Sequence, residues 1–243
     1  MAIRIAMWSG PRNISTAMMR SWGSRADTVV IDEPLYGHYL RERPEVDHPG
    51  RDEVIASMEC DWRKVVATLT GPVPGGKAIW YQKHMTHHLL PGMDRAWVGE
   101  LTNCFLIRDP REVLISLAKV APNPSVGDTG LPQQVELFEA ERKRLGRTPP
   151  VVDAKDVLVD PRRMLTAVCA ALGVPFDEGM LRWERGPRPT DGVWGKHWYS
   201  SVEQSTGFGP WRERRDALPR GLEGVERECR GLYERLWRER LRG

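Results

Sequence analysis

Residues 3–18 decide the fold, and they read Ile3-Arg4-Ile5-Ala6-Met7-Trp8-Ser9-Gly10-Pro11-Arg12-Asn13-Ile14-Ser15-Thr16-Ala17-Met18. An apolar run stops at Ser-Gly-Pro, and apolar residues then return at helical spacing, which predicts a strand, a tight loop and a helix. Asn13 or Ser15 is expected to cap that helix. The first-turn amides favour a phosphate or sulfate, and Arg12 adds a positive charge. The stretch predicts an anion-binding turn, with an ordinary strand-to-helix turn as the alternative.

This loop is close to a nucleotide-binding P-loop but departs from it in one place. A Walker A loop runs G-x-x-x-x-G-K-[ST], and counting from Gly10 it would need Gly at Ser15 and Lys at Thr16. Neither residue is present, so the loop lacks the lysine that reaches the β- and γ-phosphates. A nucleoside triphosphate is therefore a poor candidate ligand.

The composition suits one α/β domain over residues 1–243, because 243 residues with 40% hydrophobic content can bury a sizeable core. A net charge of only +3 argues against nucleic acid as the main partner. No apolar stretch reaches membrane length and no signal peptide is recognisable, so we expect a cytoplasmic protein without a membrane partner. The four cysteines have no paired spacing and are expected to be reduced thiols.

A second strand is predicted at residues 28–31, directly before Asp32-Glu33-Pro34. The carboxyl ends of parallel strands meet at the ligand crevice, so Glu33 should lie near the loop at 9–16. The alternative for Glu33 is a solvated loop acid. Residues 35–58 are expected to form a surface excursion over the site, in which the aromatic side chains either pack or contact substrate: Tyr36, His38 and Tyr39.

A third strand is predicted at residues 77–81, and the next seven residues place a cation and imidazoles at its end. Lys83 has an electrostatic role available beside an anion site. His84 and His88 are four residues apart, but no Glu lies between them as in H-E-x-x-H, and no Cys is near. We therefore expect no metal, and for each histidine either a structural role or proton transfer.

A fourth strand and a helix are predicted within residues 104–117. Asp109 suits the N-cap, Pro110 the first helical position, and Glu112 completes a capping-box-like start. Arg108 then lies at the strand end in the crevice, and Ser116 lies two turns along the helix. A guanidinium fork with a hydroxyl suits a terminal phosphate, with a structural ion pair as the alternative role for Arg108.

Several motifs together resemble those of the sulfotransferase family. Residues 11–16 are similar to the 5′-phosphosulfate loop P-K/R-S-G-T/S-T, with Asn-Ile in place of Ser-Gly. Residues 108–111, with a Ser eight positions after the first Arg, resemble the 3′-phosphate motif. Residues 152–161 and 172–176 are similar to the family's E-D-L-x-x-D-P and L-G-[IV]-P-F stretches. The resemblance covers most of residues 3–185.

The resemblance implies a sulfotransferase that uses 3′-phosphoadenosine 5′-phosphosulfate (PAPS), with no metal, on a three-layer α/β/α P-loop-type fold with a mainly parallel sheet. The implied cofactor-binding residues are Pro11, Arg12, Asn13, Ser15 and Thr16 at the 5′ end, and Arg108 and Ser116 at the 3′-phosphate. Arg12 and Lys83 would neutralise charge during transfer, and the general base would be Glu33 first, with His84 or His88 second. The acceptor would be a hydroxyl or amine of a small metabolite or carbohydrate.

Residues 186–243 match less well and are expected to form a loop and a terminal helix. Residues 205–212 distantly resemble the family's late loop that closes on the nucleotide. From Leu222 an apolar stripe predicts a helix that packs on the core or on a second copy in a homodimer: Val225, Cys229, Leu232 and Leu236. A P-loop kinase or NTPase, and a non-catalytic nucleotide-binding interaction module, stand as alternative functions.

Overall fold

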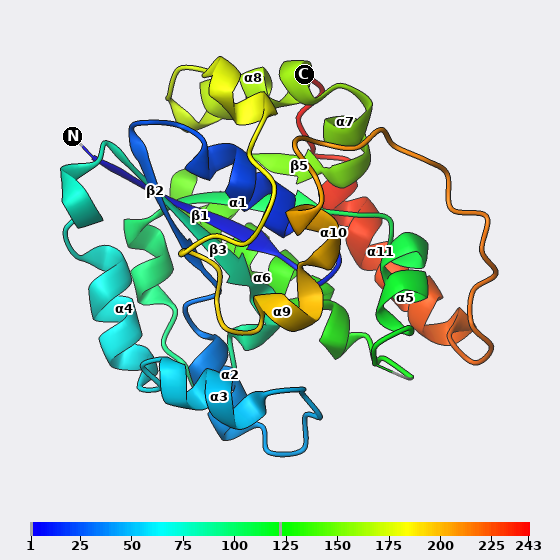
Figure 1. The fold of residues 1–243 in the computed structure, drawn as a ribbon. Coiled ribbons are helices and arrows are strands. Elements are labelled where there is room, and N and C mark those ends of the chain that lie inside the picture. Colours follow the sequence, from blue (N-terminus) through cyan, green and yellow to red (C-terminus); the bar gives the residue numbers. More distant parts are fainter. Residues whose placement is uncertain (1, 122) are drawn as a thin grey trace.

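The computed structural model describes residues 2–121 and 123–243 and contains a five-stranded parallel sheet in the order β2-β3-β1-β4-β5 (Figure 1). Because β1 is flanked by β3 and β4, the strand order reverses at β1, and the carboxyl end of β1 is the switch point where ligands bind in such sheets. The strands are β1 Ile3–Ser9, β2 Thr28–Asp32, β3 Ile79–Met85, β4 Thr102–Ile107 and β5 Val151–Asp153.

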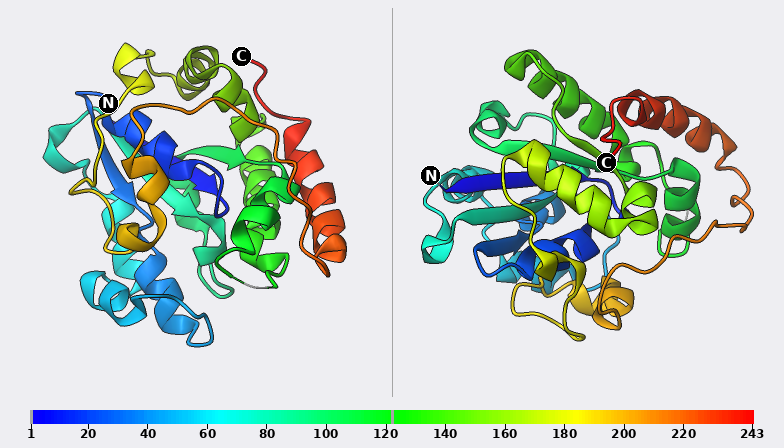
Figure 2. Two further views of the ribbon diagram at one scale, coloured as in Figure 1. Left: turned by 45° about the vertical axis from the view of Figure 1, so that its right-hand side comes forward. Right: turned by 90° about the horizontal axis from the view of Figure 1, so that it is seen from above.

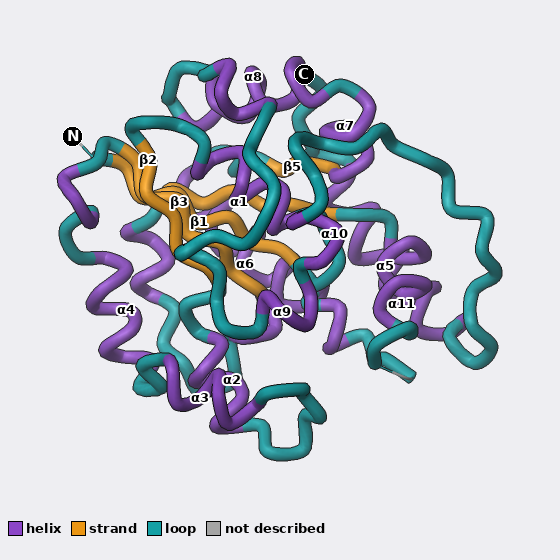
Figure 3. Tube along the Cα trace, viewed as in Figure 1, coloured by secondary structure: helices purple, strands orange, loops and turns teal. Residues whose placement is uncertain are grey.

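Helices cover both faces of this sheet and make a three-layer α/β/α arrangement (Figures 2 and 3). The α-helices are α1 Ser15–Gly23, α2 Tyr36–Glu42, α3 Arg51–Ser57, α4 Trp62–Thr70, α5 Pro110–Leu117, α6 Leu131–Leu145, α7 Ala154–Val159, α8 Pro161–Leu172, α9 Gly195–Trp198, α10 Ser200–Glu203 and α11 Glu223–Trp237. Short 3₁₀ turns are η1 Pro74–Gly76, η2 Thr86–His88, η3 Ala96–Glu100, η4 Gly127–Thr129 and η5 Glu178–Leu181. The predicted fold class is confirmed.

Two apolar layers hold the sheet between these helices. Ile5 and Met7 of β1 face a cluster with α1 and α8, whereas Ala6 and Trp8 face a cluster with α4, α6 and α11. Alternate side chains of a strand point to opposite faces, so a strand buried on both sides reads as a continuous apolar run. This explains why residues 3–8 carry almost no polar residue.

The third strand is longer than predicted, because β3 continues to Met85, which pairs with Ser9 of β1. The prediction that it ends at residue 81 is wrong, since the polar residues that follow are buried within the strand. Gln82 Nε2 donates to the Leu69 carbonyl oxygen at 2.9 Å, which satisfies its buried amide. Polar residues with such partners can continue a buried strand.

Two predicted helix caps are also wrong. Ile14, with φ 57°, occupies the N-cap of α1 without a side-chain cap, and Asn13 Nδ2 donates to the Leu106 carbonyl oxygen at 3.2 Å instead. Asp109 does cap α5 by accepting from the Arg111 N–H at 2.9 Å. Glu112 completes no capping box there, because its carboxylate pairs with Arg108.

Residues 35–58 contain helices α2 and α3 rather than only a surface excursion. Tyr36, His38 and Tyr39 are buried, which confirms the packing alternative for these side chains. At the other end of the chain, α11 packs on α5 and α6 with Cys229 and Leu236 buried, so its apolar stripe faces the core of the same chain. All four cysteines are free and buried. No helix within the described residues is long and apolar enough to cross a membrane.

Candidate active site

The loop between β1 and α1 carries the strained backbone expected of a binding turn. Arg12 and Ile14 both have positive φ, at 62° and 57°. Such conformations cost roughly 1–3 kcal/mol each in non-glycine residues and cluster at ligand sites. Because no side chain caps α1, the N–H groups of its first turn, at Ser15 and Thr16, stay available to an anion. A Cβ at Gly10 would lie 2.0 Å from the Thr129 carbonyl oxygen, so this position admits only glycine.

The two predicted phosphate motifs meet at the switch point. Arg12 Nε donates to Ser116 Oγ at 2.8 Å, and Arg108 Nη1 donates to the Arg12 carbonyl oxygen at 2.8 Å. Partial loss of water around the Arg12 guanidinium, followed by the positive charges of Arg108 and Arg214, lowers its pKa. Guanidinium groups crowded in this way are stabilised when an anion binds between them.

Arg108 also makes the ion pair that the alternative interpretation expects. Its Nε and Nη2 donate at 2.9 and 2.7 Å to Oε2 of Glu112, four residues later in the first turn of α5. The side chain therefore joins the start of α5 to the loop before α1. Both roles, structural and phosphate-binding, are compatible, because the Arg108 fork carries five N–H donors.

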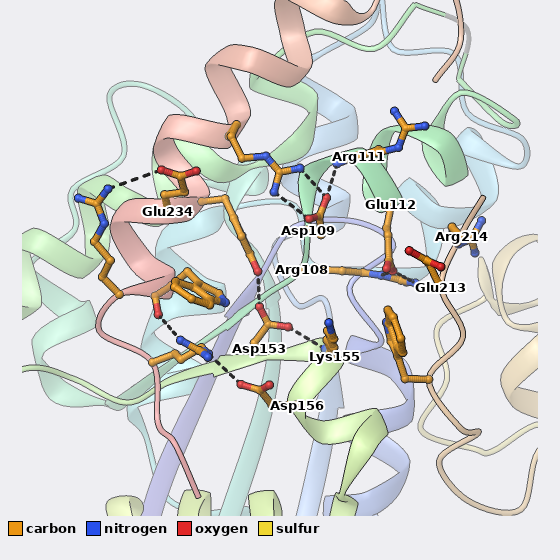
Figure 4. A pocket seen from close by; sticks show the side chains of 16 residues that line it. Arg108, Asp109, Arg111, Glu112, Asp153, Lys155, Asp156, Glu213, Arg214 and Glu234 are labelled. Carbon is orange, nitrogen blue, oxygen red and sulfur yellow. Dashed lines mark hydrogen bonds and ion pairs between the residues drawn. The ribbon is translucent and has the colours of Figure 1, made fainter. Parts of the chain in front are cut away.

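A pocket of about 680 Å³ opens beside Arg108 (Figure 4). In Figure 4 the side chains of Arg108 and Glu112 point toward the extended segment that carries Glu213 and Arg214, whereas Asp109 points toward α11. The pocket lining mixes seven cationic side chains with three aromatic rings and six carboxylates, and several of the cations are paired with those carboxylates, as Arg108 is with Glu112 and Arg240 with Asp156. The aromatic rings suit a ligand that carries an aromatic ring. The lining residues include Arg108, Arg111, Lys155, Trp211, Arg214, Arg230, Tyr233, Trp237 and Arg240.

A buried ion cluster forms at the carboxyl ends of β2 and β3. Lys83 Nζ donates to Asp32 Oδ1 at 2.8 Å, to Glu33 Oε1 at 2.5 Å and to the Tyr199 hydroxyl at 2.8 Å. A lysine ammonium has three N–H donors, and all three are used. Burial alone would lower the pKa of Lys83, but the two carboxylates outweigh it and raise that pKa. Lys83 is thus a charged group held by protein partners.

Glu33 lies at the turn after β2 with a strained φ of 42°. Its backbone N–H donates to the Lys83 carbonyl oxygen at 2.9 Å, which fixes the turn against β3. Burial raises the pKa of Glu33, while the charge of Lys83 opposes the rise. A carboxylate whose pKa is raised is a stronger base than one in water. The structure thus places Glu33 in a buried cluster and not in a solvated loop.

The histidines occupy two different environments. His88 Nε2 lies 3.9 Å from Glu33 Oε2, and its ring stacks against Tyr36 and against Tyr39, with centroid distances of 4.6 and 4.7 Å. His84 stacks on Trp8 at 4.3 Å instead, on the opposite face of the sheet from Lys83. Burial lowers the pKa of His84 to about 3 and moves the pKa of His88 well below its usual value, so both rings are neutral. The structure brings His88 to Glu33 and keeps His84 away.

Sequence reasoning did not single out Asp32, Trp194 or Tyr199 as parts of this cluster. The Tyr199 hydroxyl donates to Asp32 Oδ2 at 2.6 Å and accepts from Trp194 Nε1 at 3.1 Å. No local signal marks Tyr199, because it lies 167 positions after Asp32. Asp32 could have been anticipated only by assuming that Lys83 is buried, because a buried ammonium needs carboxylate partners.

A family model described as "Sulfotransferase domain" matches residues 3–220. Two Arabidopsis thaliana proteins are similar in sequence. They are branched-chain-amino-acid aminotransferase-like protein 1, 40% identical over 204 residues, and protein 2, 35% identical over 232 residues. The alignments cover 84% and 96% of this chain but only 36% and 41% of those proteins, so the chain spans about two fifths of their length.

Two solved sulfotransferase structures share the fold. The sulfotransferase domain from the Synechococcus PCC 7002 olefin synthase is 19% identical with a TM-score of 0.55, and the alignment covers 96% of this chain and 95% of that domain. The sulfotransferase from Alicyclobacillus acidocaldarius is 11% identical with a TM-score of 0.56, covering 99% and 98% of the two chains. With the family model spanning most of its length, this chain belongs to the sulfotransferase domain family.

Proposed function

We propose that this protein transfers a sulfuryl group from PAPS to a hydroxyl or amine of a small metabolite or carbohydrate. The contact between Arg12 and Ser116 carries the proposal, because it joins the two predicted phosphate-binding motifs across the switch point of the sheet. One anion-binding turn serves many ligands. Two such motifs, held together by Arg108, suit a nucleotide with phosphate groups at both ends of its ribose.

The described residues fit this donor. The first-turn amides of α1, with Arg12, Ser15 and Thr16, form the proposed 5′-phosphosulfate site, and Pro11 shapes the loop before them. Asn13 Oδ1 is buried without a hydrogen-bond partner in the structure, and because an amide oxygen only accepts, it suits an N–H or O–H donor and not the phosphate or sulfate oxygens. PAPS supplies the sulfuryl group when bound and leaves as adenosine 3′,5′-bisphosphate.

The proposed 3′-phosphate site consists of Arg108 and Ser116, next to the pocket. Trp211 lines that pocket and receives Lys155 over its ring at 4.3 Å, so the segment at 205–212 already lies against it. A segment in this place is suited to close on the nucleotide. The loop after β1 has no lysine at the Walker A position, so it lacks the residue that binds the β- and γ-phosphates of a nucleoside triphosphate.

In the proposed reaction the acceptor oxygen or nitrogen attacks sulfur in line with the departing phosphate oxygen. Arg12 and the α1 amides stabilise the charge on the transferred group. Glu33 takes the acceptor proton as the acceptor–sulfur bond forms. Glu33 Oε1 is held by Lys83, so Oε2, which faces His88, is the oxygen that receives the proton. His88 is the alternative base, and Lys83 acts by holding Glu33.

The remaining parts of the proposal concern setting and partners. The modest net charge of +3 supports a small-molecule acceptor over nucleic acid, and a cytoplasmic setting is part of the proposal. The aminotransferase-like names of the longer relatives describe those proteins, and no acceptor is carried over from them.

A metabolite screen tests the proposed function. The purified protein is incubated with PAPS and cell metabolites, and mass spectrometry follows both the release of adenosine 3′,5′-bisphosphate and a sulfate-sized mass gain in one acceptor. We expect both products in equal amounts, with Glu33→Gln strongly slowed. Binding of the bisphosphate without turnover on any acceptor would instead support a non-catalytic nucleotide-binding module.

A further inference from the structure

The hydroxyl of Tyr199 is fully engaged in the ion cluster at the ends of β2 and β3. It donates its proton to Asp32 Oδ2 at 2.6 Å and accepts from Lys83 Nζ at 2.8 Å and from Trp194 Nε1 at 3.1 Å. A phenol has one donor and two acceptor positions, so every one of them is used. Such a saturated group fixes the geometry of the groups around it.

The charges of this cluster do not balance by themselves. Among the residues that the structure describes, Lys83 is the single cation bonded to both Asp32 and Glu33, so the two carboxylates compete for one ammonium. The Tyr199 hydroxyl gives Asp32 a second donor at 2.6 Å, and the Gly192 N–H adds a longer bond to the same oxygen, Oδ2, at 3.4 Å. With the hydroxyl present, the Lys83 charge can be shared with Glu33 rather than drawn to Asp32 alone.

We propose that Tyr199 is a positioning residue for the reaction: by bonding Asp32 and Lys83, it keeps the Lys83 ammonium on Glu33 Oε1 and leaves Oε2 directed at the acceptor. The inference rests on the proposed role of Glu33 as general base. Tyr199 itself touches no reacting atom in this scheme, and it acts through Lys83.

The segment that carries Tyr199 is attached at several points. Asp191, shortly before α9, makes a two-bond ion pair with Arg20 of α1 at 2.7 and 2.6 Å. Trp198 Nε1 donates to His48 Nε2 at 3.1 Å, which ties α9 to the residues between α2 and α3. Through these contacts, the segment that carries Tyr199 is fixed beside the carboxylates of Asp32 and Glu33.

The pH dependence of kcat measures how the contacts of Tyr199 with Asp32 and Lys83 affect the ionisation of Glu33. The ionisable side chains that face Glu33 from the packed elements are Asp32, Tyr36, Lys83, His88 and Tyr199. The tyrosines stay neutral because burial raises both of their pKa values, and His88 stays neutral because burial lowers its pKa. Lys83 and Asp32 are therefore the charges that decide how readily Glu33 ionises.

The test compares kcat against pH for the wild type, Tyr199→Phe and Asp32→Asn at saturating PAPS. Without the hydroxyl, Lys83 shifts toward Asp32 and Glu33 becomes harder to ionise, so the acid limb of Tyr199→Phe moves up by about half to one pH unit. Asp32→Asn removes the competing carboxylate, so its acid limb moves down. General damage to the fold cannot produce shifts in opposite directions. An acid limb that stays at the wild-type pH in both variants would overturn the inference.

A double-mutant cycle separates this inference from the proposed function. If Tyr199 acts through Glu33, adding Tyr199→Phe to Glu33→Gln changes kcat less than twofold. Equal losses of kcat from Tyr199→Phe in both backgrounds would remove Glu33 from the explanation. Wild-type turnover of Glu33→Gln alone would reject the base assignment itself, whatever Tyr199→Phe does.

A matched control removes the same kind of bond elsewhere. The Tyr233 hydroxyl donates to Asp153 Oδ2 at 2.6 Å, a buried tyrosine–aspartate bond of the same length at the opposite edge of the sheet, where β5 lies. Tyr233→Phe should lose stability by a similar amount and leave the acid limb of kcat at the wild-type pH. Because Tyr233 lines the pocket beside Arg108, its KM for PAPS is measured as well, and kcat is compared at saturating PAPS. A shift of the limb in Tyr233→Phe equal to that in Tyr199→Phe would show that the shift is not specific to the cluster.

Discussion

Backbone strain is concentrated at the candidate site. Within residues 2–121 and 123–243, four non-glycine residues have positive φ, and three of them, Arg12, Ile14 and Glu33, lie at the ends of β1 and β2. None of the three has the short side chain that favours this conformation. The surrounding hydrogen bonds, such as that from the Glu33 N–H to the Lys83 carbonyl oxygen, hold the strain in place.

Replacing Glu33 by Gln should depress kcat by about 10²- to 10⁴-fold, the usual contribution of a general base. The Kd for adenosine 3′,5′-bisphosphate should change little, because Glu33 lies away from Arg108. Burial raises the pKa of Glu33, and only the ionised form can accept a proton, so wild-type kcat should fall as pH drops through this raised pKa. Steady-state kinetics across pH measure both effects. Unchanged turnover in Glu33→Gln would make His88 and then His87 the next bases to test.

Replacing Arg108 by Ala should chiefly weaken cofactor binding. A charge-assisted hydrogen bond contributes about 1.5–3 kcal/mol, so the KM for PAPS should rise roughly 10- to 150-fold. kcat should stay within a few-fold, because a contact made equally in the ground and transition states changes KM alone. Arg108→Lys, which keeps the charge but loses the fork over Arg12 and Glu112, serves as the control and should fall between. A loss confined to kcat would contradict the assignment.

Local patterns in the sequence predicted most elements, and they failed where distant partners decide the structure. The apolar run before Gly10 and the Asp109-Pro110 start of α5 contain their own signals. The extension of β3 through Gln82 and Lys83 does not, because the groups that satisfy these side chains come from Leu69, Asp32 and Tyr199. Without knowledge of those partners, a run of polar residues such as Gln82 and Lys83 predicts a loop and not a buried strand.

The attachment of the segment before α9 should depend on one buried ion pair. Arg20 and Asp191 have side chains only 3% and 7% exposed, and breaking a buried pair leaves an uncompensated charge. Asp191→Ala should therefore cost about 3–5 kcal/mol of unfolding free energy, measured by urea denaturation. Glu53→Ala, which breaks the exposed pair with Lys196 in the same segment, should cost at most about 1 kcal/mol. Equal losses in the two variants would show that burial does not govern this attachment.

The proposed nucleotide-binding groups and the proposed general base lie on opposite sides of the switch point of the sheet. The strands on one side, β1 and β4, end at the guanidinium and amide groups proposed to bind the nucleotide, and those on the other side, β2 and β3, end at the Glu33 cluster. The nucleotide side could be anticipated, because each of its motifs is continuous in sequence. The Glu33 side could be anticipated only in part, since Tyr199 reaches it from a segment whose own residues carry no comparable motif.

The whole molecule should distinguish adenosine 3′,5′-bisphosphate from ATP in its thermal stability. Binding to the folded state adds RT ln(1 + [L]/Kd), about 2.7 kcal/mol at a hundredfold excess over Kd. For a chain of this size that corresponds to a rise in Tm of roughly 5–11 °C. ATP should raise Tm much less at the same concentration, because Thr16 stands where a Walker loop has its lysine and no pair of sites receives its β- and γ-phosphates.

Differential scanning fluorimetry over a concentration series of each nucleotide, with and without Mg²⁺, measures this difference. The Arg108→Ala variant supplies the control, since it should lose most of the shift with the bisphosphate while its small response to ATP hardly changes. A metal-independent shift with the bisphosphate fits two sites built from Arg12, Ser116 and main-chain amides. Equal shifts with the two nucleotides, or a larger one with Mg²⁺–ATP, would favour a P-loop kinase or NTPase over the sulfotransferase proposed here.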